Sequence, residues 1–155
     1  MKTLFLVRHA KSSRDDPSLP DRDRPLDDRG KQDAPKMGRR LARRDVKPDL
    51  LLSSPALRAL TTAQLIAEEL GYEPKDIVVD DRLYASGADD LLAVIRALDR
   101  NLNRVMLFGH NPEFTDLATV SPSPHRHLDG MAVAAAAAVL TRTTPIVTTV
   151  VDTVR

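Results

Sequence analysis

The stretch Thr3-Leu4-Phe5-Leu6-Val7-Arg8-His9 decides how the rest of this chain is interpreted. Thr3 to Val7 is a short apolar run with β-branched and aromatic members, which predicts a strand buried on both faces. Arg8 and His9 follow directly, and open α/β sheets keep their ligand crevice at the carboxyl ends of such strands. The stretch by itself also fits an ordinary strand end with two solvated polar residues, so the remaining sequence has to decide.

The composition predicts one domain over residues 1–155. No run approaches the roughly 20 apolar residues that a membrane span needs, so no membrane partner is expected. Met1-Lys2 leads straight into the predicted strand without a signal-peptide pattern. The chain has no Cys, which excludes disulfides, thiolate catalysis and Cys-ligated metal centres. A cytoplasmic protein is the simplest interpretation.

The charge is unevenly distributed along the chain. Residues 1–60 carry 15 Lys and Arg against 9 Asp and Glu, whereas residues 61–155 carry 8 against 13. The basic first part favours an anionic partner. Nucleic acid is not expected, because aromatic residues make up only 3% of the chain and offer few surfaces for base stacking. A phosphorylated substrate fits better.

Buried strands and amphipathic helices are predicted to alternate along the chain. Further strands are expected over residues 50–52, 77–79 and 105–108, with an edge strand over 146–151. Helices are expected over residues 30–44, from Ser54-Pro55 to Gly71, after a capping box of Ser86 and Asp89, and from Asn111-Pro112 onward. Pro35 is expected only in a first turn or at a kink. This order predicts an α/β fold, a single-domain three-layer α/β/α arrangement around a mainly parallel sheet.

Four basic or imidazole side chains come just after these strands or in the next helical turn: Arg8, His9, Arg58 and His110. In a parallel sheet those positions converge on one rim. Guanidinium groups match phosphate oxygens and keep their charge. One neutral imidazole can attack phosphorus while the other donates a hydrogen bond to the developing charge. No metal site is expected, because the pair His125 and His127 has no third ligand near it in sequence.

Three separated blocks resemble the signature blocks of the histidine phosphatase superfamily, and most of all its short SixA-like phosphohistidine phosphatase branch. They are residues 6–13 (Leu-Val-Arg-His-Ala-Lys-Ser-Ser), 53–59 (Ser-Ser-Pro-Ala-Leu-Arg-Ala) and 108–112 (Phe-Gly-His-Asn-Pro). Asp23-Arg24-Pro25-Leu26 also matches that branch. The resemblance is clear over residues 1–118 and weak over 119–155. It implies a phosphoglycerate mutase-like fold. Ala10 stands where the wider superfamily has Gly, which the SixA-like branch commonly tolerates.

The resemblance implies a role for each of these side chains. His9 would be the nucleophile, Arg8 and Arg58 would bind the phosphoryl oxygens, and His110 would stabilise the transition state. Ser12 is a further candidate for a phosphate contact. Larger members supply a carboxyl as general acid, and Asp81 occupies a similar place after the third predicted strand. Asp15 and Glu113 are the alternatives for that role.

The predicted function is a metal-independent phosphatase that needs no cofactor and passes through a phosphohistidine intermediate. Its substrate would be protein phosphohistidine or a small phosphomonoester. A phosphoglycerate mutase-like phosphotransferase and a phosphate-binding module without turnover remain the alternatives. The sequence leaves the natural substrate and the oligomeric state open.

Overall fold

The computed structural model describes residues 2–111, 113–119 and 146–151. The elements follow in the order β1 (Lys2–Arg8), η1 (Asp21–Asp23), α1 (Asp28–Arg43), β2 (Leu50–Ser53), α2 (Leu57–Glu69), η2 (Pro74–Asp76), β3 (Ile77–Val79), η3 (Asp81–Leu83), α3 (Ala88–Arg96), β4 (Arg104–Gly109), α4 (Glu113–Thr119) and β5 (Ile146–Val151). The expectations that fall on Pro112, His125, His127 and residues 120–145 lie outside the described residues.

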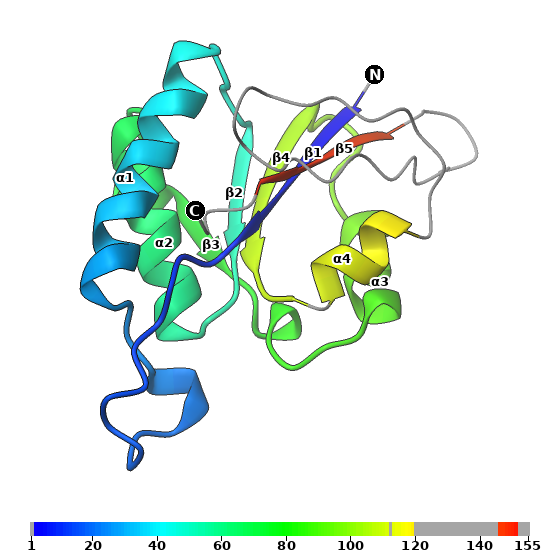
Figure 1. The fold of residues 1–155 in the computed structure, drawn as a ribbon. Coiled ribbons are helices and arrows are strands. Elements are labelled where there is room, and N and C mark those ends of the chain that lie inside the picture. The colour runs from blue at the N-terminus through cyan, green and yellow to red at the C-terminus, as the bar shows by residue number, and fades with distance from the viewer. Residues whose placement is uncertain (1, 112, 120–145, 152–155) are drawn as a thin grey trace.

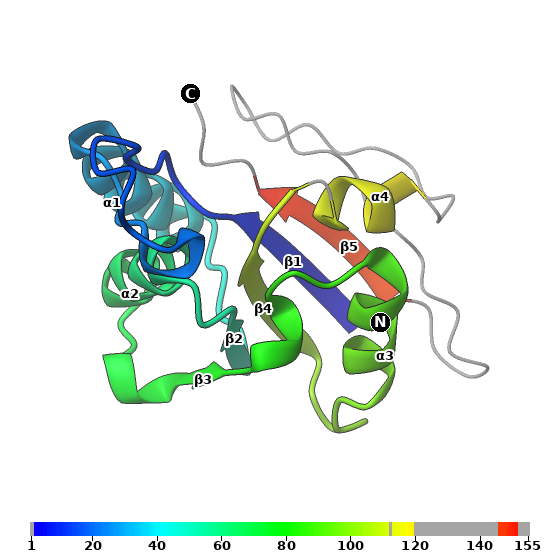
Figure 2. The same ribbon diagram turned by 90° about the horizontal axis from the view of Figure 1, so that it is seen from below.

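The strands form one parallel sheet in the order β3-β2-β4-β1-β5. The predicted α/β class is confirmed, and 146–151 is indeed an edge strand, paired in parallel with β1. Figures 1 and 2 show α1 and α2 on one side of the sheet and α3 and α4 on the other. Because helices cover both faces, the interior residues of β1 and β4 are apolar on both sides of the sheet.

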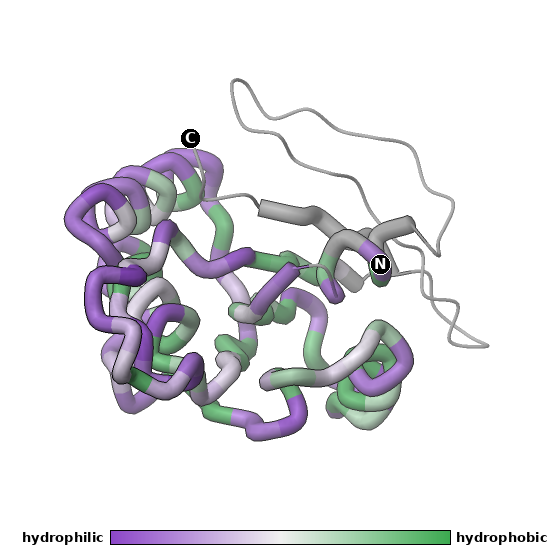
Figure 3. Tube along the Cα trace, turned by 60° about the horizontal axis from the view of Figure 1, so that its bottom comes forward, coloured by the Kyte–Doolittle hydropathy of each residue, from purple (hydrophilic) through white to green (hydrophobic). Residues whose placement is uncertain are grey.

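Alternate residues of the strands supply two hydrophobic cores. Phe5, Val7 and Phe108 pack on one face against α1 and α2. Leu4 and Leu6 pack on the other face against α3 and α4. The polar side chains lie outside these cores, and Figure 3 shows that α1 and the loop before it are largely hydrophilic.

Helix α1 begins two residues earlier than predicted, because Asp27 caps it. The Asp27 side chain accepts a hydrogen bond of 2.7 Å from the backbone N–H of Gly30. Pro35 lies inside the helix, so of the two expected places the first turn is excluded and the kink stays a prediction. Pro35 cannot donate the N–H bond to the carbonyl of Lys31, and α1 continues past this missing bond to Arg43.

Two other helix starts were also misplaced. Helix α2 begins at Leu57 with Ala56 as its N-cap, not at Ser54-Pro55. The Ser54 hydroxyl accepts from the backbone N–H of Ala56 at 3.3 Å and also contacts Nε2 of His110. Helix α3 has Gly87 as its N-cap, and Asp90 rather than Asp89 accepts the bond from the Gly87 N–H, at 3.1 Å. At the other end of α2, Gly71 has a φ of 84°, which agrees with its predicted role in closing that helix.

The order of the strands creates a crevice between β1 and β4. The chain leaves β1 towards α1 on one face of the sheet and leaves β4 towards α4 on the opposite face. Such a reversal between neighbouring parallel strands opens the space in which α/β sheets bind ligands. Within the described residues, none of the helices has the length and apolarity that a bilayer crossing requires.

Candidate active site

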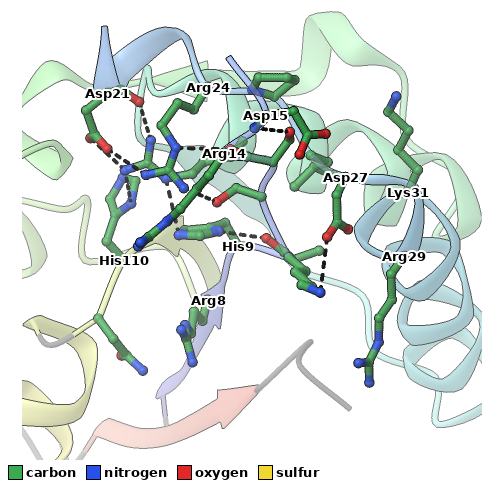
Figure 4. A pocket seen from close by; sticks show the side chains of 18 of the residues that line it. Arg8, His9, Arg14, Asp15, Asp21, Arg24, Asp27, Arg29, Lys31 and His110 are labelled. Carbon is green, nitrogen blue, oxygen red and sulfur yellow. Dashed lines mark hydrogen bonds and ion pairs between the residues drawn. The ribbon is translucent and has the colours of Figure 1, made fainter. Parts of the chain in front are cut away.

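A pocket of about 1200 Å³ lies at the carboxyl ends of β1 and β4. Its lining includes Arg8, His9, Arg58 and His110, which come from three separate parts of the chain (Figure 4). Backbone bonds hold the strand ends together, because the N–H of His9 donates to the Gly109 carbonyl at 3.0 Å. The side chains expected on one rim therefore share one pocket.

The backbone carbonyl of the next residue orients the His9 ring. Its Nδ1 lies 2.7 Å from the carbonyl oxygen of Ala10, which can only accept, so Nδ1 carries the proton and donates. The lone pair is then on Nε2, and Nε of Arg58 donates to it at 3.3 Å. This arrangement leaves the Nε2 atom of His9 as the nucleophilic nitrogen of the ring.

His110 lies edge-on to His9, with 5.3 Å between the ring centroids. Its Nε2 is 2.9 Å from the Ser54 hydroxyl and its Nδ1 is 3.4 Å from Nη2 of Arg58. Because a hydroxyl can donate or accept, Ser54 satisfies His110 in either tautomer. Nδ1 of His110 can therefore accept from Arg58, or carry a proton and donate to an anion.

Both imidazoles are held in the neutral form. Burial lowers the pKa of His9 to about 4, assisted by the charges of Arg58 and Arg8 and opposed by its bond to Ala10. Burial also lowers the pKa of His110 to about 4, with a further contribution from the charge of Arg58. Near pH 7 the His9 lone pair is therefore available for attack.

Helix α2 fixes Arg58 beside His9. The Arg58 residue is only 7% exposed. In the next turn, the Thr62 hydroxyl donates to the Arg58 carbonyl at 2.7 Å and accepts from the N–H of Ala10 at 3.0 Å. This bridge joins the residue after His9 to the turn that carries Arg58. Arg8 is the last residue of β1 and is partly buried in the pocket lining.

The remaining predicted residues differ in where they lie. Ser12 lines the pocket, and its hydroxyl accepts a bond of 2.5 Å from Nη2 of Arg24. Asp81 lies in η3 outside the pocket lining, with its side chain 82% exposed and 3.4 Å from Arg22. The structure thus does not bring Asp81 to the other site residues. Asp15 and Glu113, the alternative carboxyls, do line the pocket.

Three further pocket residues had no role in the sequence-based prediction: Asp21, Arg24 and Tyr84. Asp21 accepts bonds from Arg58, Arg24 and Tyr84. They come from a loop without periodicity and from the end of η3, so hydrophobic patterning carries no signal for them. Arg24 lies in the Asp23-Arg24-Pro25-Leu26 stretch that matches the SixA-like branch, and that match was the one available signal.

The described residues contain no group of three or more His, Asp or Glu side chains that could hold a metal ion. The pocket supplies reactive groups of its own. It offers one neutral imidazole with an unprotonated Nε2 atom, a buried guanidinium that donates to that atom, and a second imidazole able to donate. Such a set can bind a tetrahedral oxyanion and attack its central atom.

Comparison with known proteins gave matches over most of the chain. A model of the histidine phosphatase superfamily (branch 1) matches residues 4–85. An uncharacterised chloroplastic protein of Arabidopsis thaliana is 32% identical over 127 residues, which are 77% of this chain and 58% of that protein. This chain therefore spans less than two thirds of the length of that relative.

Two solved structures are similar in both fold and sequence. A crystal structure assigned as the phosphohistidine phosphatase SixA of Agrobacterium tumefaciens is 34% identical, with a TM-score of 0.68 over 75% of this chain and 74% of that one. The protein histidine phosphatase SixA complexed with tungstate is 25% identical, with a TM-score of 0.69 over 81% of this chain and 80% of that one.

Proposed function

Because this chain belongs to the histidine phosphatase superfamily and is SixA-like within it, we propose that it is a metal-independent phosphatase. Its reaction transfers the phosphoryl group of the substrate to His9 and then to water. The substrate is a phosphohistidine borne by a protein, or a small phosphomonoester. His9 is the nucleophile, and Arg8 and Arg58 bind the phosphoryl oxygens. His110 donates a hydrogen bond to the transition state.

One observation supports this proposal more than any other. The unprotonated Nε2 atom of His9 lies 3.3 Å from Nε of the buried Arg58, and the His9 and His110 ring centroids are 5.3 Å apart. A nucleophile is thus found beside donors for the charge that phosphoryl transfer develops. A surface cluster of basic residues would not have its imidazole pKa lowered by burial, as His9 has.

In the first step, Nε2 of His9 donates its lone pair to phosphorus, and a P–N bond forms as the bond to the leaving group breaks. The leaving group takes the bonding electron pair. Arg8, Arg58 and His110 donate hydrogen bonds to the phosphoryl oxygens as their charge redistributes. When the leaving group is an imidazole, it departs more readily than an alkoxide, so phosphohistidine needs less help from an acid.

In the second step, water attacks phosphorus from the side that the leaving group has vacated. The P–N bond breaks, its electron pair returns to Nε2 of His9, and phosphate is released with the proton lost by water. Asp15 and Glu113 are the pocket carboxyls that could hold a proton for an ester leaving group. Neither is needed for a phosphohistidine whose other ring nitrogen already carries a proton, because breaking its P–N bond then releases a neutral imidazole.

The size of the pocket favours a phosphorylated group carried by a protein. Small-molecule sites occupy roughly 300–1,000 Å³ and enclose most of their ligand. The cavity around His9 is about 1200 Å³. A cavity of this size can hold a phosphohistidine side chain together with part of the protein surface that carries it.

The proposal predicts that His9→Ala abolishes phosphate release from an aryl phosphate, and that EDTA leaves the wild-type rate unchanged. His9→Asn serves as a second variant with a side chain of more similar size. Circular dichroism checks that both variants are folded. Rapid quenching of the wild type should trap phosphate on His9, identified by mass spectrometry. Full activity in either variant, or loss of wild-type activity in EDTA, would contradict the mechanism.

The substrate class is tested with the same proteins. Phosphohistidine-containing proteins and small phosphomonoesters are compared by kcat/KM, with His9→Ala as the blank for each. A preference for the protein-borne group supports the substrate proposed from the pocket. Transfer to an added acceptor instead of water would identify a phosphotransferase.

A further inference from the structure

Arg58 is held on one side by Asp21. Nη1 of Arg58 donates to the backbone carbonyl of Asp21 at 2.5 Å, and Nη2 donates to its carboxylate Oδ2 at 2.9 Å. The Arg58 side chain is 8% exposed, whereas that of Asp21 is 54% exposed. The carboxylate of Asp21, which lies in η1, therefore balances the charge of the buried guanidinium.

The opposite edge of the same guanidinium faces the two imidazoles. Nε of Arg58 lies 3.3 Å from Nε2 of His9, and Nη2 lies 3.4 Å from Nδ1 of His110. A guanidinium is planar and its five N–H groups have fixed directions. When Asp21 fixes one edge, it therefore also fixes the direction of the edge that a phosphoryl oxygen would meet.

Asp21 is itself fixed by two other residues. The Tyr84 hydroxyl donates to Oδ2 of Asp21 at 3.0 Å, and Nη1 of Arg24 donates to Oδ1 at 2.9 Å. Arg24 also donates from Nη2 to the Ser12 hydroxyl and from Nε to the Ser13 carbonyl, at 2.5 and 3.2 Å. Figure 4 shows Asp21, Arg24 and His110 on the same side of the pocket.

The titration of Asp21 agrees with this geometry. Its partial burial would raise the pKa of the carboxyl, but bonds from Arg58 and Tyr84 and the charge of Arg58 outweigh that effect. Together they lower the pKa of Asp21 to about 2. Asp21 is therefore a carboxylate throughout the neutral range and not a proton donor for a leaving group.

We propose that Asp21 is a positioning residue of this site: it orients Arg58 so that Nε and Nη2 meet the phosphoryl group held over His9. The proposal rests on the phosphatase function proposed above. Asp21 has two opposite effects on anion binding, and experiment can separate them. Its negative charge by itself weakens the binding of any anion nearby, whereas its orientation of Arg58 strengthens it.

The test uses Asp21→Asn and Asp21→Ala in the full chain, with inorganic phosphate and vanadate as ligands. Misplaced donors cost most in the transition state, where rate losses of about a hundredfold follow from shifts near 1 Å. We expect kcat on an aryl phosphate to fall about ten- to a hundredfold in Asp21→Ala, with a smaller change in KM. Vanadate should bind more weakly in this variant, and by a larger factor than phosphate.

Two further variants complete the design. Tyr84→Phe removes one bond to Asp21 and should lower kcat in the same direction, by a smaller factor. Glu69→Gln breaks a comparable ion pair, 2.8 Å from Arg39 on the outer surface of α1 and α2, and should change neither kcat nor anion affinity.

Several outcomes would overturn the proposal. Tighter phosphate and vanadate binding in Asp21→Asn, with kcat unchanged, would mean that Asp21 competes with the substrate for Arg58. A lower melting temperature with wild-type kcat and anion affinity would mean that Asp21 only stabilises the loop. Absence of turnover in the wild type would contradict the phosphatase function, and the anion affinities would still test the role of Asp21.

Discussion

For single residues, the sequence alone predicts only part of the set of side chains that meet in the pocket. Arg8, His9 and His110 follow directly after buried strands, and parallel strands bring their carboxyl ends to one edge. Their common pocket could therefore be predicted. Asp21 and Tyr84 could not, because the contact between them joins residues 63 positions apart through segments without periodicity.

The same reasoning explains why the sequence pointed to Asp81 and carried no signal for Asp21. Asp81 follows β3 closely, which suggests the sheet rim, but η3 turns its side chain into solvent near Arg22. Asp21 is distant from every strand in sequence, and it enters the site only because the segment between β1 and α1 folds back. Ser13 pairs with the Pro25 carbonyl at 2.9 Å in this fold-back.

The shape of the Arg58 guanidinium, and not only its charge, should matter for activity. Arg58→Lys keeps the positive charge but replaces five directed N–H groups with one ammonium on a flexible stem. A lysine cannot reach Asp21, His9 and His110 together as the guanidinium does. We expect kcat/KM on an aryl phosphate to fall by about a hundredfold or more, as when an oxyanion donor is removed.

Steady-state kinetics measure that loss, and Arg39→Lys is the matched control. Arg39 pairs with Glu69 on the outer surface, where its side chain is 47% exposed, so its replacement should leave kcat/KM unchanged. Equal activity of Arg58→Lys and wild type would show that charge alone suffices at this position.

At the scale of elements, strands were easier to predict than helix ends. Each strand is a short apolar run between polar residues, and all five were found within a residue or two of their bounds. Helix starts depend on single hydrogen bonds instead. Asp27 begins α1 by accepting from Gly30, whereas α2 begins only at Leu57, although the Ser54 hydroxyl accepts from the N–H of Ala56.

Helix α1 also supports the loop that carries the site. A Cβ atom at Gly30 would lie 2.2 Å from the carbonyl oxygen of Lys11, which is backbone and cannot rotate away. Lys11 is also joined to the helix cap, since its carbonyl accepts from the N–H of Asp27 at 3.0 Å. The first turn of α1 thus packs directly on the chain two residues after His9.

We therefore expect Gly30→Ala to lower the free energy of unfolding by about 2 kcal/mol or more, in the range of overpacked sites. Urea denaturation followed by circular dichroism measures the change. Gly87→Ala is the matched control, because no atom lies within 4 Å of its Cβ position and its cost should stay well below that of Gly30→Ala. Equal stability of the two variants would contradict the close packing of Gly30 on Lys11.

At the scale of the whole molecule, the site joins the two sides of the sheet. Arg58 comes from α2 on one face, whereas His110 leads into α4 on the other, where Phe114 donates to its carbonyl at 3.2 Å. Helices α1 and α2 cover one face and α3 and α4 the other, so the site at the carboxyl ends of β1 and β4 draws residues from both sides. Burial of two imidazoles in this crevice then has a consequence for the stability of the fold.

His9 and His110 have a pKa of about 4 in the folded chain, against a usual value of 6.5. Between pH 6.5 and 4 the unfolded chain therefore binds more protons than the folded chain, so the free energy of unfolding falls as the pH is lowered through this range. Below about pH 4 Asp21 continues the loss, because its pKa is about 2 against 3.8 when unfolded. Urea denaturation at pH 7, 6 and 5 measures the slope. The double variant His9→Gln, His110→Gln should flatten it, and a slope unchanged from wild type would mean that neither imidazole is held neutral by the fold.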